Sequence, residues 1–470
     1  MTRTKIICTM GPSVASYETI LKLIDAGMNV ARINFSHGTH QEHGEVIARL
    51  KKAREARKIP LAIMVDTKGP EIRLGDIEGD GLHVKAGDKV QLVRKIKSAG
   101  QILLTPAEVF DSMEVGMKLL FDDGYIEGKV TMLTADGVEF QVINPGTLKS
   151  HKSVTLPEAQ VKLSAMTPQD VKDLTFACEQ NADWIAASFI RSAEHVQEIQ
   201  KLLAVKGKSD ILVMAKIESA EGVENFDSIL EAAGGIMVAR GDLGVELPIE
   251  EVPPLQKMMI RRCCEVSKPV VTATQMLESM IQNPRPTRAE VSDVANAIYD
   301  SSSAVMLSGE TAVGKYPIET VSMMKRVIKQ TELDFDYREY YDQNVSLGFS
   351  NVGTSVASAA VQTAYRAEAK AIFVFTSTGA TARLISRFRP EMPVIALTPN
   401  EKTYHQLALE WGVIPLLAGS SLTLEEAIAF SNRYAIEHKF VKKGDLVVIT
   451  TGTPFLNKGT TNTLIVEKVS

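Results

Sequence analysis

Two apolar runs, separated by an interval long enough for a helix, each end abruptly in charged side chains. The first ends in Lys216 and Glu218, and the second ends in Arg240 and Asp242. This pattern is typical of parallel strands that are buried on both faces and carry charge only at their C-terminal ends. Two carboxylates from neighbouring strands could bind a hard divalent cation, although a salt-bridge cluster between the strands is the simpler alternative.

Strand-plus-helix units of this kind recur along the chain. The expected strands are residues 5–9, 29–33, 61–65, 184–187, 211–215, 236–239, 270–273 and 304–307. Helix-capping sequences begin at Thr167 and Thr287, between the strands. Eight parallel units predict an α/β fold, a (β/α)8 TIM barrel whose functional groups lie at the C-terminal strand ends.

Short alternating strands interrupt this series between residues 74 and 163. Turn sequences such as Asp80-Gly81 and Asp123-Gly124 separate them. The segment reads as a small all-β domain inserted into a loop that follows a barrel strand. An insertion at that place is a candidate lid over the site.

A second α/β pattern follows an acidic, aromatic stretch without a clean period at residues 332–351. A helix is expected near residues 352–366, and strands are expected at 371–375, 394–397, 446–449 and 463–466. We therefore predict three domains. They are a barrel from residues 1–72 and 164–335, an inserted β-barrel lid from 73–163, and a C-terminal α/β regulatory domain from 350–470.

The net charge of the 470-residue chain is -5, which gives no general attraction to nucleic acid or to anionic membranes. No apolar run approaches the length that spans a bilayer, and the N-terminus lacks the hydrophobic core of a signal peptide. The four cysteines have no C-x-x-C spacing, which favours reduced thiols. We expect a cytoplasmic protein that binds neither nucleic acid nor membrane.

Polar groups follow most of the expected barrel strands. Besides the four residues named above, they are Arg32, Asn34, Ser36, Asp66, Thr67, Arg73, Thr274, Ser308 and Glu310. Cations, carboxylates and hydroxyls gathered at one rim suit an anionic, metal-assisted reaction. Phosphoryl transfer fits well, because it depends on positioning and on neutralising charge spread over oxygens.

Six segments together resemble the pyruvate kinase family in order and spacing. They are residues 34–38, 66–73, 216–218, 239–244, 273–277 and 306–311. The inserted β domain and the appended α/β domain match as well, so the resemblance covers essentially the whole chain. It implies transfer of the phosphoryl group of phosphoenolpyruvate to ADP, followed by protonation of the enolate to pyruvate. It also implies a regulated homotetramer.

By this resemblance, Lys216, Arg73 and Arg32 would stabilise the transferring phosphoryl group, and Lys216 would also hold the enolate. Glu218 and Asp242 would bind the catalytic Mg²⁺ or Mn²⁺ ion.

The substrate carboxylate would lie at Gly241, Asp242 and Thr274. Ser308 and Glu310 would belong to the region that delivers the proton, as would Thr274 through water, and the sequence does not choose among them.

Asn34, Ser36, Asp66 and Thr67 resemble the potassium ligands of the family. Glu71 matches family members that require K⁺, whereas a lysine at that position goes with independence of K⁺. A fixed ammonium group could replace the charge of the ion.

Pro12, His37 and Lys152 would lie near the adenine nucleotide by the same resemblance, Lys152 coming from the inserted domain. His37, His40 and His43 recur at every third position, but no cysteine or acid completes a zinc-like set with them.

A hydroxyl-rich turn in the C-terminal domain resembles the sugar-phosphate effector loop of regulated members. Its residues are Thr376, Ser377, Thr378, Gly379 and Thr381. Free amides and hydroxyls can bind phosphate there, although a plain turn capped by threonine is the alternative. A sugar phosphate or AMP is the expected effector. Lys458 is the only cation of the facing loop at residues 451–460.

Two other functions remain open at this stage. A metal-dependent aldolase or mutase acting on phosphoenolpyruvate or pyruvate would share the lysine and acids, but it would not explain the inserted or C-terminal domains. A catalytically silent sugar-phosphate sensor would need only the C-terminal site, and loss of Lys216, Glu218 or Asp242 would favour it. All three residues are present.

Overall fold

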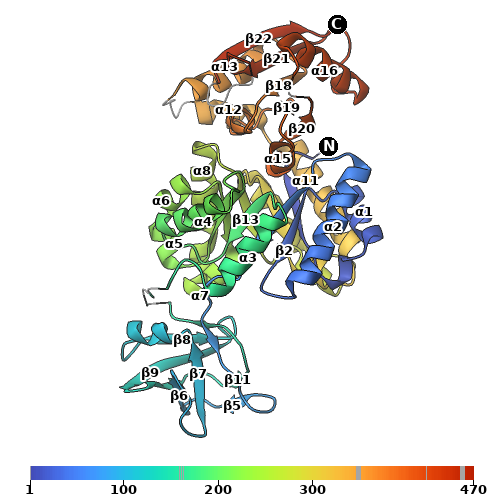
Figure 1. Cartoon of the computed structure of the whole chain (residues 1–470). Coiled ribbons are helices and arrows are strands. Elements are labelled where there is room, and N and C mark those ends of the chain that lie inside the picture. The colour runs from blue at the N-terminus through green and yellow to red at the C-terminus, as the bar shows by residue number, and fades with distance from the viewer. Residues whose placement is uncertain are drawn as a thin grey trace.

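The computed structural model describes residues 2–157, 159, 161, 163–345, 351–419, 421–455 and 461–470. Three bodies lie in a row, with a closed barrel in the middle, a β domain at one end and an α/β domain at the other (Figure 1). No helix in the described ranges is both long and apolar enough to cross a membrane.

The middle body is a closed barrel of eight parallel strands. These are β1 (Lys5–Thr9), β2 (Val30–Asn34), β3 (Ala62–Asp66), β13 (Trp184–Ala187), β14 (Leu212–Ile217), β15 (Gly235–Ala239), β16 (Val270–Ala273) and β17 (Ala304–Leu307). Almost every residue in these strands is buried, which explains their unbroken apolar runs. The barrel confirms the predicted fold class.

Helices surround the barrel. They are α1 (Tyr17–Ala26), α2 (His40–Arg57), α3 (Pro168–Glu179), α4 (Ala193–Val205), α5 (Ala220–Glu224), α6 (Phe226–Ala232), α7 (Arg240–Glu246), α8 (Val252–Glu265), α9 (Arg288–Tyr299), α10 (Gly309–Ala312) and α11 (Pro317–Asp334). Thr167 and Thr287 form the capping boxes expected of them. Gly27, at a φ of 134°, ends α1.

The inserted segment between β3 and α3 forms a seven-stranded sheet and a two-stranded sheet around a core of its own. Its strands are β4 (Arg73–Leu74), β5 (Leu82–Val84), β6 (Lys89–Val93), β7 (Gln101–Thr105), β8 (Lys118–Phe121), β9 (Ile126–Thr134), β10 (Gly137–Val142), β11 (Gly146–Leu148) and β12 (Val154–Thr155). The domain lies beyond the barrel end at which α7 begins, which is the C-terminal end of the strands (Figure 1).

The C-terminal body is a five-stranded sheet in the order β20-β19-β18-β21-β22, in which only β22 is antiparallel to its neighbour. The strands are β18 (Ala371–Phe375), β19 (Val394–Thr398), β20 (Val413–Leu417), β21 (Leu446–Thr451) and β22 (Thr463–Lys468). Its helices are α13 (Val352–Arg366), α14 (Ala380–Ser386), α15 (Glu401–Gln406) and α16 (Leu424–Glu437).

The elements of this region that were not predicted from the sequence are α15, α16, β20 and one further helix. β20 contains Pro415, which lowers strand propensity, and the strand is tolerated because it lies at the edge of the sheet. The aromatic stretch taken as a plain junction contains α12 (Tyr337–Val345). Tyr337 packs near Trp411 and Tyr341 near Phe388, so tertiary contacts stabilise a helix with little amphipathic pattern.

The C-terminal domain closes the N-terminal end of the barrel. Ala408 and Leu409 belong to the same buried cluster as the side chains inside the barrel. The Trp184 indole donates to the Gln406 carbonyl at 3.4 Å, and Gln406 Nε2 donates to the Asp183 carbonyl at 3.1 Å. The two ends of the barrel are therefore covered by different domains, and only the end facing the β domain is available for a site.

Candidate active site

Lys216 lies at the C-terminal end of β14 and makes three close polar contacts. Its Nζ is 2.8 Å from Ser188 Oγ, 2.9 Å from Glu218 Oε1 and 3.2 Å from Asp66 Oδ1. Burial opposes the charge of the ammonium group, but the Asp66 and Glu218 carboxylates outweigh it and raise the pKa of Lys216 above its ordinary value. Lys216 is therefore a buried, permanently charged cation.

Arg32 and Asp66 form a second buried ion pair beside it. Arg32 Nε donates to Asp66 Oδ2 at 2.5 Å, and its Nη1 donates to Thr9 Oγ1 at 3.0 Å. Burial alone would raise the pKa of Asp66, but Arg32 and Lys216 together lower it. Asp66 thus joins the two cations, one at each carboxylate oxygen.

Glu218 and Asp242 come from neighbouring units of the barrel and line one cavity. Glu218 directly follows β14, and its Oε2 accepts the Phe189 N–H at 2.6 Å. Burial raises the pKa of Glu218 to about 7, although the nearby Lys216 ammonium lowers it. Burial also raises the pKa of Asp242. Two buried carboxylates that disfavour their own charge are a donor set that fits a hard divalent cation.

That cavity has a volume of about 320 Å³ and lies between the barrel and the β domain. Barrel acids line one side, and Val154, Leu156 and Pro157 of the insertion line the other. Arg73 lies where the chain enters the insertion. Its Nε contacts Glu71 Oε2 at 2.5 Å, and its Nη1 donates to the His151 carbonyl at 2.6 Å.

Gly241 and Thr274 connect α7 to the end of β16. The Gly241 N–H donates to Thr274 Oγ1 at 2.8 Å. Thr274 has a φ of 70° and Gln275 a φ of 53°, a conformation that a β-branched residue rarely adopts. Backbone strain of this kind is frequent at functional sites, where the surrounding structure maintains it.

Arg240 does not join the carboxylates, contrary to the arrangement expected from the sequence. Its guanidinium contacts Asp293 of α9 at 2.7 Å and donates to the Thr274 carbonyl at 2.7 Å. Because these partners lie on other elements of the barrel wall, Arg240 fixes the strained Thr274 turn and does not line the cavity, whose lining includes the cations Arg73 and Arg191.

Asn34, Ser36, Asp66 and Thr67 follow the paired strands β2 and β3. Asn34 and Asp66 are register partners, and Asn34 Oδ1 accepts the Ser36 N–H at 3.1 Å. Asp66 and Thr67 are buried. The structure thus gathers amide, hydroxyl and carboxylate oxygens, which is a donor set that fits a hard monovalent cation.

Ser308 and Glu310 lie just beyond β17. Glu310 is fully buried, and its two oxygens accept the backbone N–H groups of Ser308 at 2.7 Å and Leu277 at 3.1 Å. Burial raises its pKa. With both oxygens engaged, Glu310 orients the backbone of two loops, while the Ser308 side chain remains partly exposed.

The three residues expected near a nucleotide lie on two domains. Pro12 begins a short helical turn after β1, and the exposed His37 follows β2, its carbonyl accepting His43 Nε2 at 2.7 Å. Lys152 lies in the inserted domain and pairs with Asp122 of the same domain at 2.7 Å. Lys152 is therefore paired within its own domain, and the other two residues lie on the barrel.

Ser188 was missed in the sequence analysis. It directly follows β13, the one barrel strand from which no functional residue was expected, yet it contacts Lys216, Asp66 and the Thr67 carbonyl. Its position one residue beyond a buried strand was the available signal, because Thr67, Glu218, Thr274 and Ser308 occupy the same position after their strands.

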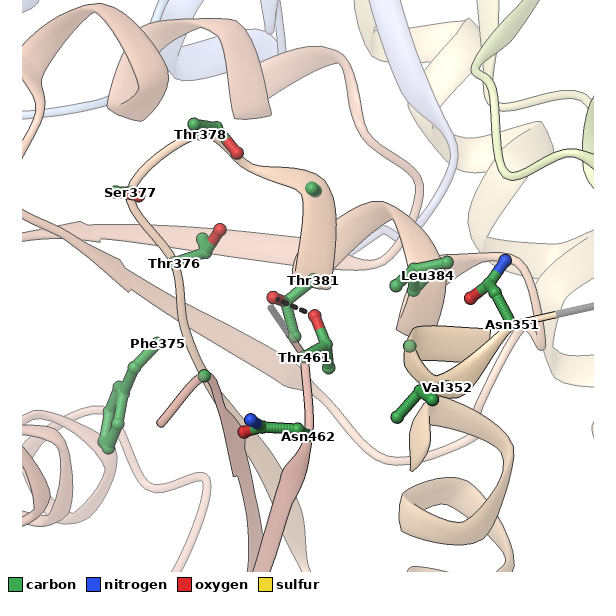
Figure 2. A pocket seen from close by; sticks show the side chains of 13 residues that line it. Asn351, Val352, Phe375, Thr376, Ser377, Thr378, Thr381, Leu384, Thr461 and Asn462 are labelled. Carbon is green, nitrogen blue, oxygen red and sulfur yellow. Dashed lines mark hydrogen bonds between the residues drawn. The ribbon is translucent and has the colours of Figure 1, made fainter. Parts of the chain in front are cut away.

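A second cavity, of about 630 Å³, lies in the C-terminal domain at the loop after β18 (Figure 2). Thr376, Ser377, Thr378 and Thr381 line it, and Thr381 shares a 2.8 Å hydrogen bond with Thr461 from the facing segment. Gly379, at a φ of 83°, permits the turn, and its N–H donates to Thr376 Oγ1 at 3.0 Å. Lys458 lies outside the described residues.

Comparison with known proteins gives the family. Residues 1–321 match the model described as pyruvate kinase, barrel domain, and residues 354–467 match that described as pyruvate kinase, alpha/beta domain. The pyruvate kinase of Chlamydia muridarum is 50% identical over 426 residues, which cover 89% of this chain and 88% of the relative. That of Clostridium acetobutylicum is 44% identical over 472 residues, with 100% of both chains covered. That of Geobacillus stearothermophilus is 43% identical over 472 residues, which cover 100% of this chain and 80% of the relative. The chain belongs to the pyruvate kinase family.

Proposed function

We propose that the C-terminal end of the barrel transfers the phosphoryl group of phosphoenolpyruvate to ADP and then protonates the enolate to give pyruvate. Membership of the pyruvate kinase family makes the chain a phosphotransferase of glycolysis. The observation that carries the residue-level proposal is Lys216, a buried cation held between Asp66 and Glu218.

Lys216, Arg73 and Arg32 supply the positive charge of the reaction. The P–O bond to the enol oxygen breaks while a new one forms to a terminal phosphate oxygen of ADP, and the charge in transit is spread over phosphoryl oxygens. Lys216 then remains beside the enolate oxygen that the departing group leaves behind. Fixed cations in a water-poor site stabilise such charge without reorganising.

Glu218 and Asp242 would hold the divalent cation, Mg²⁺ or Mn²⁺. The family generally uses a divalent metal together with K⁺. When bound, the divalent ion supplies charge neutralisation at the phosphoryl and enolate oxygens. The raised pKa values of both carboxyls support this role, since a nearby cation would keep both groups ionised.

Asn34, Ser36, Asp66 and Thr67 would hold K⁺. Glu71 carries the carboxylate expected of members that require this ion, and it also contacts Arg73. Replacement of the ion by a fixed ammonium would then need a lysine at position 71.

Gly241 and Thr274 would bind the substrate carboxylate, with Asp242 beside them. The Thr274 hydroxyl and the partly exposed Ser308 would then protonate the enolate, directly or through water. Glu310 serves this region by orienting the backbone of Ser308.

The inserted domain would close over this cavity, bringing Lys152 toward the nucleotide that Pro12 and His37 contact. Arg73 lies at the entry to the insertion, so its contact with the substrate would change as that domain moves.

The cavity at Thr376, Ser377, Thr378, Gly379 and Thr381 would bind a sugar phosphate or AMP as effector. Its hydroxyls and its size suit a phosphorylated small molecule. A cytoplasmic homotetramer, regulated by movement of subunits and domains, completes the proposal.

The test is pyruvate formation from phosphoenolpyruvate and ADP with Mg²⁺, compared in K⁺ and Na⁺, with sugar phosphates and AMP then added singly. Turnover that needs both Mg²⁺ and K⁺ supports the proposed active site. An effector that shifts the dependence of the rate on phosphoenolpyruvate concentration identifies the ligand of the second cavity. Folded protein without turnover contradicts the proposal. The aldolase or mutase and the silent sensor are not supported, because both domains match pyruvate kinase models.

A further inference from the structure

Ser188 is buried among residues from three barrel strands. Its Oγ lies 2.8 Å from Lys216 Nζ, 3.2 Å from Asp66 Oδ1 and 2.7 Å from the Thr67 carbonyl. Its backbone N–H donates to Thr67 Oγ1 at 3.2 Å. Side chain and backbone of Ser188 thus both connect to Thr67, and the side chain alone connects to Lys216.

The three acceptors around Lys216 differ in what else they are expected to do. An ammonium group has three N–H donors, and here the three contacts are Glu218, Asp66 and Ser188. Glu218 and Asp66 are the proposed ligands of the divalent and the monovalent cation. Ser188 is the uncharged acceptor, and it alone has no proposed ion to bind.

The direction of the Ser188 hydroxyl follows from its partners. It has one proton, which goes to the closer oxygen, the Thr67 carbonyl, and its lone pairs are then available to the Lys216 ammonium. Because Thr67 is a proposed K⁺ ligand, the position of the hydroxyl depends on the backbone of the monovalent site.

We propose that Ser188 is a positioning residue that connects the monovalent-cation site to Lys216. Ser188 contacts Thr67 on one side and the Lys216 ammonium on the other. It therefore keeps Lys216 in place when the Asp66 and Glu218 carboxylates bind their cations. Ordering of Thr67 by K⁺ would then also order Lys216. This inference rests on the proposed function and gives a route by which the monovalent-cation site acts on the position of Lys216.

The test is Ser188→Ala in the full chain, which removes the hydroxyl and keeps the backbone N–H bond to Thr67. We expect kcat to fall about tenfold or more, while the KM for phosphoenolpyruvate changes less than about threefold, because positioning acts on the reacting geometry. The half-saturating K⁺ concentration should rise about threefold or more.

A second readout needs no turnover. K⁺, compared with choline at equal ionic strength, should raise the thermal unfolding midpoint of the wild-type chain through binding to the folded state. In Ser188→Ala this K⁺-dependent rise should fall to about half or less, since the Thr67 side of the site loses its partner.

Ser302→Ala is the matched control. Its hydroxyl is also fully buried and shares a 2.7 Å hydrogen bond with Thr272. It has no place in the proposed site. Each variant loses one buried hydroxyl, so Ser302→Ala should lower the unfolding midpoint measured without K⁺ about as much as Ser188→Ala does. Unlike Ser188→Ala, it should leave kcat and the K⁺ dependence unchanged.

If the wild type makes pyruvate and Ser188→Ala matches it in kcat and in its response to K⁺, the Ser188 assignment fails alone. Equal losses of kcat in Ser188→Ala and Ser302→Ala would also overturn it, since a general loss of packing would then suffice. If the wild type makes no pyruvate, the proposed function fails and takes the Ser188 assignment with it.

Discussion

Lys216 Nζ lies 2.9 Å from Glu218 Oε1, although the two residues are only two positions apart at the end of one strand. Adjacent strand residues alternate in direction, so residues two apart share a face, and here both point to the site. Asp66 extends the contact to Arg32. The cations that would neutralise a phosphoryl group are thus fixed before any substrate arrives, which is the requirement for electrostatic catalysis.

Gly241→Ala should weaken substrate binding without weakening the fold. A Cβ at position 241 would lie 3.5 Å from Thr274 Oγ1, an ordinary contact, and alanine favours the helix α7 over glycine. The added methyl would, however, occupy space beside the proposed carboxylate-binding N–H. We expect the KM for phosphoenolpyruvate to rise about tenfold at an unchanged or higher unfolding midpoint. An unchanged KM would place the carboxylate elsewhere.

Glu71→Lys should reduce the need for K⁺. The new ammonium would stand close to Arg73, and by the proposed analogy it would supply the positive charge of the missing ion. Turnover in Na⁺ or choline should then reach about half or more of that in K⁺. Glu71→Gln, which removes the carboxylate without adding a cation, is the control and should retain the K⁺ requirement. An unchanged requirement in Glu71→Lys would count against the potassium assignment.

Acid should destabilise the contact between the C-terminal domain and the barrel through His405. Burial, helped by Arg54 and Lys402, lowers the pKa of His405 from 6.5 to about 3. In the unfolded chain His405 takes up a proton near pH 6.5, but in the folded chain only near pH 3. Stability is therefore lost as the pH falls through this window, by about 1 kcal/mol per pH unit.

Chemical unfolding of the wild type and of His405→Gln between pH 7 and pH 4.5 measures this contribution. The variant should show a shallower loss of stability with falling pH. His438→Gln, at an exposed position on the same domain, should keep the wild-type slope. Equal slopes in all three proteins would mean that His405 is not buried in its neutral form.

Leu409→Ala should test whether the C-terminal domain closes the barrel. Leu409 is fully buried in the cluster inside the barrel, so its truncation should cost about 2 to 5 kcal/mol of unfolding free energy. Leu417→Ala, at a residue that is 41% exposed, should cost about 0.5 kcal/mol or less. Equal effects at the two positions would argue against the buried contact.

Much of the barrel could be predicted because its strands are buried on both faces. Ala304–Leu307 is apolar from end to end, Val270–Ala273 is apolar except for Thr272, and each is followed at once by a polar residue. Such runs identify both the strand and the end of the strand at which chemistry lies. β20 gave no such signal, because Pro415 interrupts it. Proline is tolerated at the edge of a sheet, but that position depends on the tertiary structure and is not visible in the sequence.

The sequence indicated which residues follow the barrel strands, but it did not indicate which of them contact one another. The positions of Lys216 and Arg240 after their strands are equivalent in the sequence, yet the first faces the acids and the second faces Asp293. Ser188 has no charge and no motif of its own, and its role appears only once Lys216 and Thr67 lie on either side of it. Side-chain direction at a strand end depends on packing against other elements, which periodicity does not encode.

The most direct test of the account is pyruvate formation by the wild type and by Lys216→Met, assayed with phosphoenolpyruvate, ADP, Mg²⁺ and K⁺. Loss of the buried ammonium should lower kcat about a thousandfold or more, because the charge in transit loses its fixed cation. Lys51→Met, on the outer helix α2, should keep full activity. Circular dichroism should confirm that all three proteins are folded. Near-normal turnover of folded Lys216→Met would contradict the assignment of phosphoryl transfer to this site.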